Sequence, residues 1–408
     1  MVLRRHPEYR KLWTGQTISA FGSRITAVAL PLAAVVVLHA TPVQMGVLAA
    51  LAVLPHLLFG LPAGVWVDRL SRRAILVVAD VGRAMVLGTI PVLGVLGLLR
   101  VEHLYAVAFL TGLMTTFFDT SATSLVPALV GRENLIRANG AWVLGNTVAG
   151  AAGPSLGGWL VQVLTAPVAV AFDAASFVLS AVCTLLVRVK EAPRARDQVR
   201  FWPGMVAGLR VLFGSPILRP VTVSATLGAL AGAMQSALIV LYLVRDLALT
   251  PALVGLAFGV TGGASVVGAL LSRWFSERLG PGPAYVTGAL LFGLGTLVLA
   301  SAGGPRAAVL LILLLALVLA GLGPPLFGVP QTTLRQTLTP DHLLGRVNAA
   351  WRFLVFGVQP LGALLGGALG AAIGLRATLV VSGLGVLAAF VFAFRSPVRT
   401  LRQVPSPG

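Results

Sequence analysis

Six charged residues lie inside stretches that are otherwise apolar: Arg24, Asp80, Arg83, Asp119, Asp173 and Arg352. An ionised side chain in an apolar environment is costly unless an opposite charge or a ligand compensates it. A carboxylate in such a place can exchange a proton, and an arginine can hold an anion or keep a nearby carboxylate ionised. These six residues are therefore the first candidates for chemistry, and the rest of the chain has to position them.

The usual catalytic and metal-binding patterns are missing from the sequence. Cys183 is the single cysteine, the five histidines form no HExxH, and neither Lys11 nor Lys190 stands in a phosphate-binding loop. A formal GxSxG runs from Gly153 to Gly157 in an apolar segment, without the strand-turn-helix context that a hydrolase needs. We therefore expect no metal, no cofactor and no enzymatic activity.

The positioning elements are predicted to be membrane-spanning helices. Of the 408 residues 57% are hydrophobic and 10% are charged, whereas soluble domains carry about 25% charged residues. A helix needs about 20 apolar residues to cross the bilayer. Twelve such windows occur, at 12–38, 43–67, 74–99, 104–127, 138–161, 167–188, 217–244, 251–272, 284–302, 307–330, 348–373 and 377–395.

The positive charges predict how these spans are oriented. Of the 30 Lys and Arg residues, 23 fall at the two termini or in the loops that share their side, and four fall in the opposite loops. Cationic loops stay in the cytoplasm, so both termini are expected there. The net charge of +18 is therefore assigned to membrane topology and lipid headgroups, and no nucleic-acid partner is expected.

A polar stretch at 189–216 divides the chain into two sets of six spans. We expect an N-terminal six-helix bundle at 1–188, a cytoplasmic linker at 189–216 that could include a helix on the lipid surface, a C-terminal bundle at 217–396 and a tail at 397–408. The expected fold is an all-α polytopic membrane protein with twelve transmembrane helices in two pseudo-symmetric bundles.

An internal repeat at an offset of 209 residues supports this division. The shift aligns Thr41-Pro42 with Thr250-Pro251, Asn139 with Asn348, and Trp142 with Trp351, without a gap. Equivalent residues are six spans apart, so the halves are parallel repeats. The six intramembrane charges are not repeated, which is expected if they serve transport rather than packing.

The loop "GVWVDRLSRR" between spans two and three resembles the signature loop of the major facilitator superfamily, at Gly64, Asp68, Arg69, Arg72 and Arg73. The resemblance implies a latch that holds the halves in one conformation, with Glu277 and Arg278 as its degenerate copy. An ordinary positively charged loop is the alternative.

Span five resembles the antiporter motif of the same superfamily, at Gly140, Gly153, Pro154, Gly157 and Gly158. Small residues every four positions, from Gly145 to Gly157, predict a smooth face for close helix packing. "YRKLWTGQTISAFG" and "VGRENLIRANGAW" add a resemblance to the branch that contains enterobactin exporters and macrolide-efflux proteins.

The resemblance also implies roles for the charges. Arg24 and Asp119 lie near mid-depth by helical rise, and spans one and four line the cavity in this superfamily, so the two could meet and couple proton movement to transport. A static buried ion pair is the alternative. Asp80 and Arg83 are expected to pair locally with each other or with the Asp68 loop, and Asp173 to be a solvated helix cap. Arg352 is expected to contact an anionic substrate or the same cavity.

The cavity wall is assigned by span alone to Gln16, Thr115, Thr116, Phe118, Met234, Gln235, Phe327, Gln331, Phe356 and Gln359. We expect a monomeric, proton-coupled exporter of drug-like or siderophore-like molecules in the bacterial cytoplasmic membrane. Three alternatives stay open: an importer or facilitator of the same superfamily, a channel, and a membrane enzyme.

Overall fold

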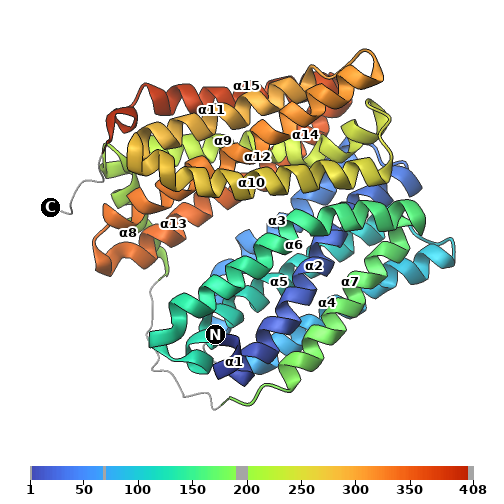
Figure 1. The fold of residues 1–408 in the computed structure, drawn as a ribbon, viewed down its shortest axis with the longest axis horizontal. Helices are drawn as coiled ribbons and strands as arrows, with labels where there is room; N and C mark the ends of the chain where they lie inside the picture. Colours follow the sequence, from blue (N-terminus) through green and yellow to red (C-terminus); the bar gives the residue numbers. More distant parts are fainter. Residues whose placement is uncertain (1, 68–69, 190–200, 403–408) are drawn as a thin grey trace. The chain divides into compact units, whose positions relative to one another are not determined.

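The computed structural model describes residues 2–67, 70–189 and 201–402, and these residues are helical throughout apart from short connections (Figure 1). Eleven segments of the described chain are long and apolar enough to cross a membrane. The remaining expected span, 138–161, is also a helix, Leu135–Val163, whose glycines and polar residues lower its hydropathy. The expected all-α polytopic fold is thus confirmed.

The helices before the linker follow the predicted windows closely. They are α1 (Val2–Arg5), α2 (Pro7–Leu32) with a π-helical continuation at Ala33–Val37, α3 (Pro42–Val67), α4 (Arg72–Val95), α5 (Val101–Val130), α6 (Leu135–Val163) and α7 (Ala166–Leu185). The uncharged run from Ala138 to Phe172 divides between Val163 and Ala166, as its Thr165-Ala166-Pro167 turn predicts.

The later helices are α8 (Phe201–Gly214), α9 (Leu218–Arg245), α10 (Pro251–Arg278), α11 (Pro281–Ala300), α12 (Arg306–Thr337), α13 (Leu344–Gly357), α14 (Gln359–Ala372) and α15 (Leu375–Phe394). Short 3₁₀ turns occupy Arg132–Asn134, Asp341–Leu343 and Pro397–Thr400. Helix α8 shows that the linker does contain a helix, and residues 190–200 of the linker lie outside the described chain.

The structure differs from two of the predicted windows, although one candidate span, Asp341–Ala372, still covers the first of them. The window 348–373 is interrupted at Val358, because Pro360 in the first turn of α14 cannot continue the helical hydrogen bonding of α13. Helix α12 does not end at 330 but runs to Thr337, through Pro324, Pro325 and Pro330. This extension moves Arg335 from an expected loop into a helix.

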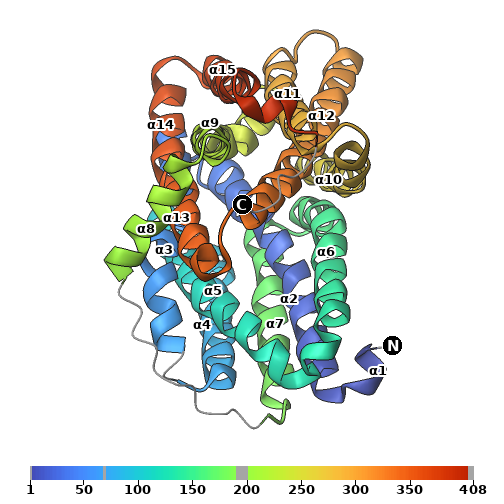
Figure 2. The same cartoon turned by 90° about the vertical axis from the view of Figure 1, so that its left-hand side faces the viewer.

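The chain forms two compact units. The first unit comprises Met1–Thr41, Leu51–Arg196 and Leu249–Gly259, and the second comprises Pro42–Ala50, Asp197–Ala248 and Val260–Gly408. In the first unit, α2 packs on α6 and α7, and α4 packs on α5 and α7 (Figures 1 and 2). Helices α2, α4 and α7 consequently enclose the side chains discussed below.

Packing within the second unit depends on close backbone approach. Helix α11 lies along α12 and α15, α9 lies along α14 and α15, and α8 covers α13 (Figure 2). A Cβ atom at Gly288 would lie 2.5 Å from the Phe327 backbone nitrogen, and one at Gly295 would lie 2.6 Å from that of Ala320. Glycine therefore sets the distance between α11 and α12, as is common between membrane helices.

Candidate functional site

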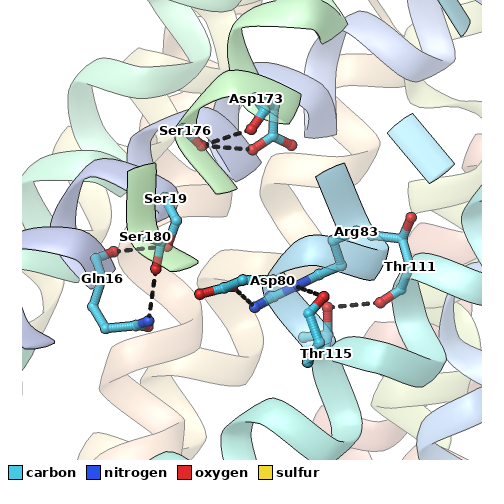
Figure 3. A network of polar contacts seen from close by, with 10 residues as sticks. Gln16, Ser19, Asp80, Arg83, Thr111, Thr115, Asp173, Ser176 and Ser180 are labelled. Carbon is cyan, nitrogen blue, oxygen red and sulfur yellow. Dashed lines mark hydrogen bonds and ion pairs between the residues drawn. The ribbon is translucent and has the colours of Figure 1, made fainter. Parts of the chain in front are cut away.

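A buried ion pair joins Asp80 and Arg83 on helix α4 (Figure 3). The two residues are three positions apart, so they share one helix face, and Arg83 Nη2 donates to Asp80 Oδ1. Asp80 is 0% exposed and Arg83 is 4% exposed. The predicted local pairing is confirmed, and the pair is shielded from solvent.

Two aromatic rings complete the surroundings of Arg83. Its guanidinium carbon lies 4.3 Å from the centre of the Phe118 ring on α5 and 4.1 Å from that of Phe177 on α7. A desolvated cation between ring faces gains about 2 kcal/mol from each favourable contact. Arg83 thus links α4, α5 and α7.

Asp173 is a buried carboxylate on the neighbouring helix, α7. It is 1% exposed, and it accepts a hydrogen bond of 3.2 Å from Ser176 Oγ at Oδ1. A Cβ atom at Gly22 of α2 would lie 2.5 Å from the same oxygen, so the glycine makes room for the carboxylate. The expectation of a solvated helix cap was wrong, because α2 covers this face of α7.

Further polar side chains extend this arrangement between α2 and α7. Gln16 Nε2 donates to Ser180 Oγ at 3.3 Å, and Ser19 Oγ donates to the Gln16 carbonyl at 3.2 Å. Figure 3 shows these residues beside the ion pair and below Asp173. We call Gln16, Asp80, Arg83, Asp173, Ser176 and Ser180 the buried polar network.

The internal repeat allows the surroundings of the ion pair to be compared with the equivalent positions of the second unit, which carry no charge. Ala289 and Phe292 stand where Asp80 and Arg83 stand in the first unit, and Phe327 stands where Phe118 stands. The Phe292 and Phe327 rings are 6.4 Å apart, so an aromatic pair replaces the contact of Arg83 with Phe118. The equivalent helices of the second unit thus pack without these charges, which favours a functional reason for the charges of the first unit.

The position equivalent to Asp173 in the second unit is also uncharged. Ser382 is the counterpart of Asp173, and its Oγ donates to the Ala231 carbonyl at 2.7 Å. Ala231 is itself the counterpart of Gly22. A serine therefore suffices to tie the two helices together in the second unit, whereas the first unit carries a carboxylate.

Arg24 and Asp119, the predicted coupling pair, both have exposed side chains in this structure. The exposure of both side chains does not match the alternative of a static buried pair. The aliphatic base of Arg24 lies against α6, where a Cβ atom at Gly153 would be 2.5 Å from Arg24 Cβ. Their role in coupling stays a prediction.

The described arginines of the signature loop donate hydrogen bonds to backbone carbonyls of α5 and α7. Arg72 Nη1 donates to the Ser124 carbonyl of α5 at 3.2 Å, and Arg73 donates to the carbonyls of Thr184 and Leu185 at the end of α7. A cation there complements the partial negative charge of the helix terminus. Part of the loop motif therefore anchors α4 within its own unit.

The described chain includes some of the other residues of the predicted latch. Gly64 belongs to α3, while Asp68 and Arg69 lie outside the described residues. In the degenerate copy, Glu277 forms an exposed ion pair of 2.8 Å with Arg273, and Arg278 is the last residue of α10. A latch between the halves stays a prediction.

The glycine strip of α6 packs closely, and the helix that it contacts is α2. A Cβ atom at Gly145 would lie 2.9 Å from Thr17 Oγ1, and one at Gly157 would lie 3.0 Å from the Ile25 Cα atom. Gly158 lies against the α10 segment of the same unit, and Pro154 is buried, whereas Gly140 has no neighbour within 4 Å of such a Cβ atom. The close packing of α6 on α2 is thus explained.

The predicted cavity residues differ in their contacts and exposure. Thr115 and Thr116 donate to the carbonyls one turn earlier, Phe118 is buried against Arg83, and Gln235 Oε1 accepts from Thr296 at 2.9 Å. The others have varied exposure: Met234 and Gln331 are buried, Gln16, Phe327 and Gln359 are intermediate, and Phe356 and Arg352 are exposed.

Arg335 is the charged residue that the sequence reasoning missed. It is 8% exposed in the last turns of α12, because the helix continues beyond the predicted end. The absence of Gly or Asn between Pro330 and Thr337 is the signal that could have extended the window.

Comparison with known proteins decides the family. The family model described as "transmembrane secretion effector" matches residues 3–406. The chain belongs to this family of major facilitator transporters. The enterobactin exporter EntS of Salmonella typhi is 28% identical, over 99% of this chain and 96% of that protein. EntS of Escherichia coli O1:K1 / APEC is 29% identical, over 99% and 95%.

Solved structures agree on the major facilitator fold. A bacterial homologue of the iron transporter ferroportin, in an inward-facing state, matches with a TM-score of 0.77 and 19% identity, over 95% of this chain and 98% of that one. The nucleoside transporter NupG matches with a TM-score of 0.74 and 14% identity, over 95% and 99%. At these identities the likeness concerns the fold alone.

Proposed function

We propose that this chain exports siderophore-like or drug-like small molecules across the bacterial cytoplasmic membrane, with both termini in the cytoplasm. The observation that carries the proposal is similarity to named exporters over 99% of this chain and 96% of the relative. Transport would proceed by alternating access, in which substrate and coupling ion bind the two conformations with different affinities. A monomer is sufficient for this cycle, and we assign the chain no enzymatic role.

We propose protons as the coupling ion, with Arg24 and Asp119 as the exchange pair and Arg352 as a contact for anionic substrates. The exposure of Asp119 supports this assignment, since a proton must reach the carboxylate from water. The buried polar network would hold α2, α4 and α7 together during the cycle. The loop from Gly64 to Arg73 would latch the conformation in which the cytoplasmic side is closed.

The first experiment expresses the chain in an enterobactin-producing bacterium that lacks its own exporter. Under iron limitation, catecholate is measured separately in medium and cells. Export predicts that catecholate moves from cells to medium, and the same strain is screened against a panel of amphipathic toxins. Increased accumulation in the cells would instead indicate an importer.

The coupling assignment is tested in inverted membrane vesicles. Substrate uptake driven by an imposed pH gradient should fall at least ten-fold in Asp119→Asn. The control Asp246→Asn removes an exposed carboxylate just beyond α9 and should transport like the wild type. Full gradient-driven uptake by Asp119→Asn would remove Asp119 from the mechanism without affecting the export proposal.

A further inference from the structure

Three buried nitrogen donors in the second unit have no acceptor among the described residues: Gln331 Nε2, Arg335 Nη1 and Trp351 Nε1. Gln331 is 4% exposed and Arg335 is 8% exposed. More than 90% of buried polar groups in native proteins have a hydrogen-bond partner. Three unpaired donors on two adjoining helices therefore require an explanation. We call Gln331, Arg335 and Trp351 the donor cluster.

The geometry around Arg335 shows that these donors belong to one site. Gln331 and Arg335 are four residues apart on α12, so they lie on the same helix face. The guanidinium carbon of Arg335 lies 4.1 Å from the centre of the Trp351 ring on α13. Arg335 Nε donates to Asn348 Oδ1 at 2.8 Å, which fixes the plane of the guanidinium group.

The positive charge of the Arg335 guanidinium group is not balanced by a carboxylate of the described residues. No ion pair joins Arg335 to a carboxylate of the described residues. Arg352 follows Trp351, lies one helical turn from Asn348, and is near enough for its charge to act on Arg335. Arginine stays protonated in proteins, so burial cannot neutralise this site.

The chemistry of a ligand follows from these donors. Water could accept from Gln331 or Trp351, but it carries no negative charge to compensate Arg335. A planar guanidinium group beside two further N–H donors is suited to an anion with several acceptor oxygens. The ligand must therefore be both anionic and rich in oxygen.

We propose that the donor cluster is a binding site for an oxyanion, held by Arg335 Nη1, Gln331 Nε2 and Trp351 Nε1, with Arg352 adding positive charge. The oxyanion is a phosphate group, supplied either by an anionic lipid headgroup or by a small soluble molecule. Arg335 and Trp351 have no role in the proposed export, so their variants can lose phosphate binding, and this proposal can fail, while the proposed export stands.

The test measures thermal unfolding of the full chain in a neutral detergent at constant ionic strength. Inorganic phosphate and phosphatidylglycerol are titrated separately, with chloride and phosphatidylcholine as references. Each probe that binds the folded chain should raise the melting temperature in a saturable way. Stabilisation by phosphate indicates an open site for soluble oxyanions, and stabilisation by phosphatidylglycerol alone identifies a headgroup site.

Substitutions locate the binding. Arg335→Gln should weaken the apparent affinity about ten- to hundred-fold, as expected for loss of a charged hydrogen bond. Arg395→Gln, which removes an exposed arginine of the same unit, should bind like the wild type. Trp351→Phe keeps an aromatic ring beside Arg335 and removes one donor, so its apparent affinity for the probe should fall a few-fold. This variant tests the site if Arg335→Gln does not fold.

Two results overturn the proposal. One is the absence of a saturable shift with both probes in the wild-type chain. The other is an unchanged shift in folded Arg335→Gln, or in Trp351→Phe where the first variant does not fold, because binding would then occur elsewhere.

Discussion

Replacing the buried pair of the first unit by its counterparts from the second should separate structural from functional roles. The variant Asp80→Ala/Arg83→Phe copies Ala289 and Phe292. Phe at position 83 would lie between the rings of Phe118 and Phe177, where the guanidinium group now lies 4.3 and 4.1 Å from their centres. The double variant is therefore expected to fold.

The magnitudes follow from burial. Asp80→Asn leaves Arg83, 4% exposed, without its counter-charge, and breaking a buried pair in this way costs about 3–5 kcal/mol. Arg83→Met leaves a carboxyl group that can take up a proton, so its cost should be smaller. The double variant removes both charges, and such replacements are neutral or stabilising by about 1–4 kcal/mol.

The assay is thermal unfolding in detergent. Unfolding is monitored through the reaction of a thiol-specific dye with Cys183, the single cysteine. The expected melting temperatures place the double variant at or above the wild type, followed by Arg83→Met and then Asp80→Asn. A double variant as unstable as Asp80→Asn would refute the reasoning, since the charges would then have a structural role beyond their pairing. If the double variant is stable but exports nothing, the pair serves transport.

Three further substitutions test the packing of the first unit. Gly22→Ala should lower stability by about 1–3 kcal/mol because its Cβ atom would meet Asp173 and Ser176, and adding Ser176→Gly should recover part of the loss. Arg73→Gln should cost about 1 kcal/mol by freeing the carbonyls at the end of α7, whereas Arg73→Lys should cost less; equal melting temperatures would contradict this. Gly153→Ala should lower the melting temperature, whereas Gly140→Ala should not, because there is open space around Gly140. Equal effects would contradict the close packing of the α6 glycine strip on α2.

The sequence alone was sufficient wherever the feature depended on composition or on spacing along one helix. The number and approximate bounds of the spans follow from the bilayer thickness, and the Asp80–Arg83 pair follows from the three-residue separation on α4. The small-residue strip of α6 was predicted for the same reason, because the periodicity of a helix places every fourth residue on nearly one face.

Only the tertiary structure decided which helix faces meet. Asp173 changes from an expected surface cap to a buried carboxylate because α2, with Gly22, covers it. Arg335 becomes a buried cation because α12 extends past its prolines and packs beside Trp351 of α13. Helical periodicity sets the spacing of side chains along each helix, but the rotation of one helix against another depends on contacts between residues far apart in the chain.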